Sequence, residues 1–204
     1  MKRSILTHAA VAAILSTSVW ASSSIAAQPA VASNSEAGAP TDAVDRVERG
    51  RYVVTVSGCN DCHTPWIVGP NGPEPDMSRM LSGHPEGDAL PPAPAPSGPW
   101  IVAAAATNTA WSGPWGVSFT ANLTPDPETG LGRWTQRNFT ETLRTGRHMG
   151  RGRAILPPMP IPMYRHFTDA DLAAIFAYLQ SIPAVRNRVP EPLPPEPQAA
   201  VAAQ

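Results

Sequence analysis

The sequence contains one short run whose residue types can hold a metal cofactor covalently, Cys59-Asn60-Asp61-Cys62-His63. Its two thiols are separated by about one helical turn, so each can add to one vinyl group of a haem. The imidazole of the next residue then lies under the iron. This C-x-x-C-H spacing is the signature of covalent haem attachment. It predicts Cys59 and Cys62 as the anchors of one haem c, and His63 as an axial ligand of its iron.

Three other chemistries use the same residue types. A structural zinc site needs about four ligands, and the chain has 2 cysteines in all. A thioredoxin-like redox pair belongs near a βαβ pattern, whereas the residues after His63 are rich in proline. A disulfide across two residues closes so small a loop that it stabilises little. The haem interpretation is therefore preferred over all three.

The second axial ligand is predicted to be Met159, which lies in Leu156-Pro157-Pro158-Met159-Pro160. The three prolines stiffen the backbone and can present a thioether at a fixed distance. Packing in the core is the alternative role for this methionine. Met163 is the runner-up and Met149 is third, while Met77 and Met80 are weaker candidates. A bis-histidine site would use one of the histidines His84, His148 and His166.

The N-terminus has the features of an export signal. Lys2 and Arg3 precede a mostly apolar run over 9–19, and small residues follow up to about residue 27. This pattern predicts a signal peptide over 1–27 and a periplasmic protein. A retained membrane anchor is the alternative, although the run is shorter than the roughly 20 residues that a spanning helix needs.

The rest of the chain divides by composition. Residues 28–41 form a flexible linker, residues 42–184 the haem domain, and residues 185–204 a disordered tail rich in proline. Helical spacing predicts a helix that begins near Asp42 and ends at Gly58, although the β-branched run over 53–56 fits a strand equally well. Caps and apolar stripes predict helices over 136–145 and 168–181.

Composition sets limits on structure and partners. The formal net charge of −1 argues against a general nucleic-acid-binding surface. The chain has 25 prolines and 15 glycines, which predicts long loops and few helices. The least regular part is 64–121, where Gly-Pro steps alternate with tryptophans. These aromatic residues suggest that the loop packs onto something large and apolar.

Several motifs resemble the class I bacterial cytochromes c, in particular those that partner periplasmic dehydrogenases of alcohols, aldehydes and sugar acids. They are Cys59–Pro65, Leu131–Thr135, Pro158-Met159-Pro160, Ala177-Tyr178-Leu179 and Gly50. The resemblance covers 42–184. It implies an all-α cytochrome c fold with few helices. The chain departs from the family in the long separation of His63 from Met159, so 64–121 is interpreted as a long Pro/Gly/Trp-rich loop insertion. The resemblance also implies that Gly50 and Tyr178 meet where the first and last helices cross.

The expected function is electron transfer by one haem c in the periplasm, from a dehydrogenase or quinol donor to a respiratory acceptor such as an oxidase or another cytochrome. We expect no catalytic residues and no enzymatic activity of the protein alone. Two alternatives remain. The chain can be a subunit of a dehydrogenase or oxidase complex, or a haem enzyme or sensor whose sixth coordination position is open.

Overall fold

The computed structural model describes residues 43–93 and 99–195. The predicted signal peptide (1–27) and linker (28–41) lie outside these residues. Within the described part, the helices are α1 (Ala43–Val56), α2 (Cys59–His63), α3 (Gln136–Thr145), α4 (Ile161–Tyr164) and α5 (Asp169–Ser181), with 3-10 turns η1 (Met77–Arg79) and η2 (His148–Gly150). The strands are β1 (Trp66–Gly69), β2 (Gly72–Pro75), β3 (Ala103–Ala104), β4 (Ala110–Gly113) and β5 (Gly116–Phe119). None of the described helices has the length and apolar character that a membrane crossing requires.

The prediction of an all-α fold is wrong, because much of the 64–121 segment forms two small antiparallel sheets instead of loops. One sheet pairs β1 with β2, and the other has the order β3-β4-β5. Two of the Gly-Pro segments that predicted loops lie at hairpin turns, where Gly69 pairs with Gly72 and Gly113 pairs with Gly116. Between the turns stand aromatic and β-branched residues such as Trp66, Ile67 and Val68, which favour a pleated strand.

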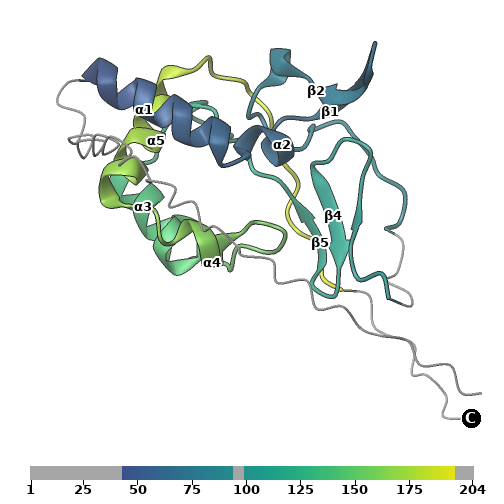
Figure 1. Cartoon of the computed structure of the whole chain (residues 1–204). Coiled ribbons are helices and arrows are strands. Elements are labelled where there is room, and N and C mark those ends of the chain that lie inside the picture. Colours follow the sequence, from purple (N-terminus) through teal and green to yellow (C-terminus); the bar gives the residue numbers. More distant parts are fainter. Residues whose placement is uncertain (1–42, 94–98, 196–204) are drawn as a thin grey trace, which may run out of the picture. The chain divides into compact units, whose positions relative to one another are not determined.

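The first and last helices, α1 and α5, pack directly against each other (Figure 1). Gly50 of α1 lies at the crossing, where an added Cβ would be 2.0 Å from the carbonyl oxygen of Ala174 and 2.8 Å from Cβ of Tyr178. The predicted meeting of Gly50 and Tyr178 is therefore confirmed. A hydrogen atom in place of a side chain is what lets the two backbones approach so closely.

Replacing Gly50 with valine should destabilise the protein by roughly 1–3 kcal/mol or more, because the new side chain meets the backbone of α5 and overpacks the crossing. Denaturant unfolding followed by circular dichroism measures the change. Gly87→Ala is the matched control, since nothing lies within 4 Å of a Cβ added there. Equal stabilities of the two variants would contradict this account of the crossing.

Two helices begin and end where their local signals predict. The hydroxyl of Thr135 accepts from the backbone N–H of Asn138, and Gly146 ends α3 in the left-handed conformation. Likewise, the hydroxyl of Thr168 accepts from the N–H of Asp171 and starts α5. The apolar faces of these helices join that of α1 in one core, which contains Val53, Val54, Leu81, Leu131, Phe139, Leu143, Ile161, Leu172, Ile175, Leu179 and Ile182.

The described part of the predicted disordered tail, residues 185–195, makes specific contacts. Asn187 is buried, with 2% of its surface exposed. Leu193 exchanges two backbone hydrogen bonds with Val117 of β5, both of 2.9 Å. The chain therefore continues past α5 as an ordered segment that returns to the strands.

Candidate haem site

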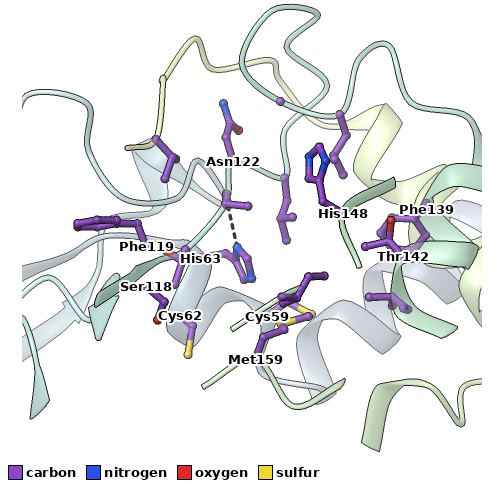
Figure 2. A pocket seen from close by; sticks show the side chains of 18 of the residues that line it. Cys59, Cys62, His63, Ser118, Phe119, Asn122, Phe139, Thr142, His148 and Met159 are labelled. Atoms are coloured by element: carbon purple, nitrogen blue, oxygen red, sulfur yellow. Dashed lines mark hydrogen bonds between the residues drawn. The ribbon is translucent and has the colours of Figure 1, made fainter. Parts of the chain in front are cut away.

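A cavity of about 490 Å³ lies between the helices and the β5 region. All four predicted site residues line it: Cys59, Cys62, His63 and Met159 (Figure 2). Its volume is within the roughly 300–1,000 Å³ of ordinary ligand pockets. The walls are largely apolar, with Val54, Leu123, Leu131, Phe139, Leu143, Ile175 and Leu179 among them. Two thiols, an imidazole and a thioether in an apolar cavity form a donor set that fits a covalently held haem.

His63 is held in an orientation that suits a metal ligand. Its side chain is buried, and its Nδ1 lies 2.8 Å from the carbonyl oxygen of Ala121. A carbonyl can only accept, so Nδ1 carries the hydrogen and Nε2 keeps its lone pair. Burial lowers the pKa of His63, and the bond to Ala121 opposes that shift. The neutral imidazole with a free Nε2 is the form that binds a metal ion.

Helix α2 is held in place from both of its ends. The hydroxyl of Thr64 donates to Oδ1 of Asn60 at 2.8 Å and accepts from the N–H of Leu81 at 2.9 Å. The carbonyl of His63 accepts from the N–H of Gly83 at 2.7 Å. Gly58, at φ 68°, makes the sharp turn between α1 and α2. The short helix is therefore anchored by residues that come later in the chain.

The β-rich segment also contacts α2 directly. The carbonyl of Asp61 accepts from the indole N–H of Trp66 at 3.0 Å and from the side-chain amide of Asn108 at 2.7 Å. The carbonyl of Ala121, which orients His63, follows β5. The 64–121 segment thus forms part of the site and positions its central helix.

The two thiols lie in surroundings that disfavour a thiolate. Burial raises the pKa of the Cys59 thiol to about 12, and burial is also the main reason that the pKa of Cys62 is raised. Thiol-disulfide oxidoreductases depend on a cysteine whose pKa is lowered. The environment of Cys59 and Cys62 therefore argues against the thioredoxin-like alternative.

Met159 is the methionine that lines the cavity among the described residues. It is half-buried and packs against the core, and the preceding segment is fixed by the hydroxyl of Ser118, which donates to the carbonyl of Pro157 at 2.6 Å. The runner-up, Met163, is 69% exposed. Met149, Met77 and Met80 do not line the cavity either.

The three histidines of the bis-histidine alternative lie in different places. His148 lines the cavity and packs edge-on against Trp134, with ring centroids 5.1 Å apart. Burial, followed by the charge of Arg153, lowers its pKa. His84 is fully buried away from the cavity, where its Nδ1 and the Thr109 hydroxyl form a hydrogen bond of 2.9 Å. His166 is exposed and does not line the cavity.

Sequence reasoning missed several residues of the site. The acceptor for His63 is a backbone carbonyl, which no residue type can reveal. Tyr164 of α4 lines the cavity and donates from its hydroxyl to the carbonyl of Ser57, close to the start of α2. The sequence shows only that Tyr164 lies close to another aromatic residue, Phe167, whose ring it contacts in the structure. Residues 188–192 also line the cavity, although they follow the last helix.

His84 should make the fold sensitive to acid. Burial lowers the pKa of His84 below its ordinary value of 6.5. His84 therefore binds a proton less readily in the folded protein than in the unfolded chain. This difference stabilises the fold above pH 6.5, and the stabilisation is lost as the pH falls toward the folded pKa. The expected loss is at most about 1.4 kcal/mol per pH unit for one such group. Denaturant unfolding between pH 7.5 and 5 should show a weaker pH slope for His84→Gln than for His166→Gln, which changes an exposed position. Equal slopes would contradict this role.

Known proteins resemble this chain over most of its described length. No protein-family model matches it. A subunit of the nicotinate dehydrogenase of Pseudomonas putida is 32% identical over 144 residues, which are 71% of this chain and 9% of that protein. The cytochrome c subunit of the quinone-dependent alcohol dehydrogenase of Gluconobacter oxydans is 28% identical over 148 residues, 71% of this chain and 24% of that protein. The fructose dehydrogenase cytochrome subunit of Gluconobacter japonicus is 25% identical over 178 residues, 84% of this chain and 29% of that protein.

The chain thus spans less than a third of the length of each of these relatives. Two of the three are cytochrome subunits of dehydrogenases by name. The chain is similar to cytochrome c subunits of dehydrogenases, and this similarity supports a c-type cytochrome.

Proposed function

We propose that the protein is a class I cytochrome that carries electrons through one covalently bound haem c. The observation that carries this proposal is the meeting of Cys59, Cys62, His63 and Met159 in one cavity, with Nε2 of His63 left available by the bond from Nδ1 to Ala121. The chain's 2 cysteines both belong to this motif, which supports a single haem.

Each site residue has a separate part in this proposal. Cys59 and Cys62 would hold the haem covalently, and His63 and Met159 would bind its iron. The haem supplies reversible one-electron chemistry when it is bound. The apolar side chains of the cavity exclude water, and ligation by methionine opposite histidine favours a comparatively high reduction potential. In this proposal the protein alone is an electron carrier and not an enzyme, and no residue of the site has a part in substrate chemistry.

The partners in this proposal are redox proteins. A dehydrogenase or quinol is the donor, and an oxidase or another cytochrome is the acceptor. The names of the relatives from Gluconobacter support a dehydrogenase as donor, either as a separate protein or in a complex of which this chain is a subunit. The export signal that the sequence predicts over 1–27 supports a periplasmic location, and we propose 42–184 as the minimal haem domain.

The optical spectrum of the exported protein tests the proposal, together with a denaturing gel stained for haem. Haem that stays on the denatured chain, a low-spin reduced spectrum and a far-red sulfur-to-iron band in the oxidised protein are expected. A high-spin spectrum that changes with carbon monoxide would contradict the electron carrier and favour a haem enzyme or sensor. Absence of covalent haem would exclude both.

A further inference from the structure

Five consecutive residues after the last helix, 188–192, line the haem cavity. We call this segment the C-terminal strap. It runs from the end of the helical core back to β5 (Figure 1). Pro190 and Pro192 restrict its backbone, so it can form a wall with little loss of entropy on folding.

Asn187 anchors the strap at its start. Its side-chain amide donates to the carbonyl of Ser82 at 2.7 Å and to that of His84 at 2.8 Å, and its Oδ1 accepts from the N–H of Glu86 at 2.8 Å. Its own backbone N–H donates to the hydroxyl of Thr129 at 3.0 Å. A buried amide with all these bonds satisfied has one low-energy position, so the chain leaves Asn187 in a fixed direction.

Two further contacts hold the rest of the strap. Glu191 accepts an ion pair from Nε of Arg153 at 3.3 Å. Leu193, directly after the strap, is paired with Val117. The strap is therefore held at both ends and in its middle. It closes one wall of the cavity.

The strap contains a positively charged side chain, Arg188, that is not paired with another described residue. Arg188 lines the cavity, and its guanidinium has no hydrogen bond or ion pair to another of the described residues. Its backbone N–H, by contrast, is fixed to Oε2 of Glu86 at 3.1 Å. The other charged or titratable groups around the cavity, His63 aside, are the thiols of Cys59 and Cys62, the Tyr164 hydroxyl, Glu128, His148, Arg153 and Glu191.

The location of this wall indicates what Arg188 would meet. Figure 2 shows His148 on the far side of the pocket from the sulfur atoms of Cys59 and Cys62. The backbone N–H of His148 donates to the carbonyl of Arg153 at 2.9 Å, and Arg153 forms the ion pair with Glu191 that holds the strap. A haem has its vinyl groups on one edge and its two propionates on the other, so a ring anchored by these cysteines turns its carboxylates away from them. A guanidinium is the side chain best suited to bind a carboxylate with two hydrogen bonds.

We propose that the C-terminal strap closes the cavity at the carboxylate edge of the haem, and that Arg188 on the strap binds a haem propionate. This inference rests on the proposed function. The domain that holds the cofactor then extends past the last helix, at least to Leu193. Arg188 is a positioning residue that also tunes the iron, because a cation near the haem favours the ferrous state.

Variants of two nearby arginines test the inference on the exported, haem-loaded protein. Arg188→Gln should lower the midpoint potential and shift the propionate bending band in the resonance Raman spectrum, while Arg188→Lys should keep most of the potential. Arg186→Gln is the matched control, since Arg186 lies two residues before Arg188 and bears the same charge but pairs with Glu86 and does not line the cavity. Both arginines are exposed, so these variants should fold.

The variant Asn187→Ala tests whether Asn187 holds the strap in place. Loss of its anchor should speed hydrogen exchange at the amides of Val189 and Glu191 and lower the potential by admitting water. The inference is overturned if Arg188→Gln and Arg186→Gln give the same small shifts and the Raman band stays in place. Absence of covalent haem from the unmodified protein would instead refute the proposed function, so the two failures are distinguishable.

Discussion

The double variant Cys59→Ser, Cys62→Ser should carry no haem after denaturation. Both thiols line the haem cavity, and the chain has no other cysteine that could form a thioether. The expected loss of haem stain is complete, and the mass of the denatured chain should fall by one haem relative to the unmodified protein. Each single variant should keep at most one thioether, with a shifted reduced spectrum because one vinyl group stays unreacted. A denaturing gel stained for haem and intact-mass spectrometry measure both effects.

Asp61→Asn is the control for this experiment. Asp61 lies between the two cysteines and its side chain is exposed, while its backbone carbonyl holds Trp66 and Asn108. The substitution leaves both thiols, His63 and that carbonyl in place, so haem attachment should persist. Haem that stayed bound to the double cysteine variant under denaturing conditions would contradict the assignment of the anchors.

Met159→Ala should remove the far-red sulfur-to-iron band and lower the midpoint potential by about 0.1 V or more. Methionine opposite histidine raises the potential of a haem, and axial ligands together set haem potentials over about 0.8 V. The iron should become high-spin or bind an added ligand such as imidazole or carbon monoxide. Redox titration with optical detection measures the potential, and the ligand titration reports the open position.

Met163→Ala provides the matched control, four residues further along the chain. Met163 is 69% exposed and does not line the cavity, so its loss should change neither the band nor the potential. The reverse result, with the band lost in Met163→Ala and kept in Met159→Ala, would transfer the ligand role to Met163. A band kept in both variants would assign the sulfur ligand to another methionine, such as Met149.

Local signals were sufficient for the elements that depend on neighbours in sequence. The caps of α3 and α5 come from Thr135 and Thr168, which bond to backbone N–H groups three residues later. A turn formed by Gly58 separates α1 from the C-x-x-C-H motif, as its position in the sequence predicts. The close approach of the two helices at Gly50 could be predicted only from the family resemblance, since nothing in the sequence of α1 identifies the helix that packs against it.

The strands within 64–121 could not be predicted from local sequence signals, unlike the helices α3 and α5. Glycine-proline steps mark a hairpin turn and a long loop equally well, and strands of two to four residues have too little periodicity to distinguish them. Pairing decides between the two, as when Ala110 of β4 meets Phe119 of β5. Such pairing depends on the whole segment folding back against α2.

The sequence by itself determined which chemistry is available: two thiols and an imidazole at the spacing of haem attachment, and a methionine among prolines. Only the tertiary structure decided how these groups are presented. The carbonyl of Ala121 comes 58 residues after His63 and orients its ring, and Ser118 fixes Pro157 from 39 residues away. Arg188 reaches the cavity because Asn187 binds carbonyls more than 100 residues earlier. Each of these contacts joins a side chain to a backbone carbonyl, and every residue type carries the same carbonyl, so only the folded chain can select which one is used.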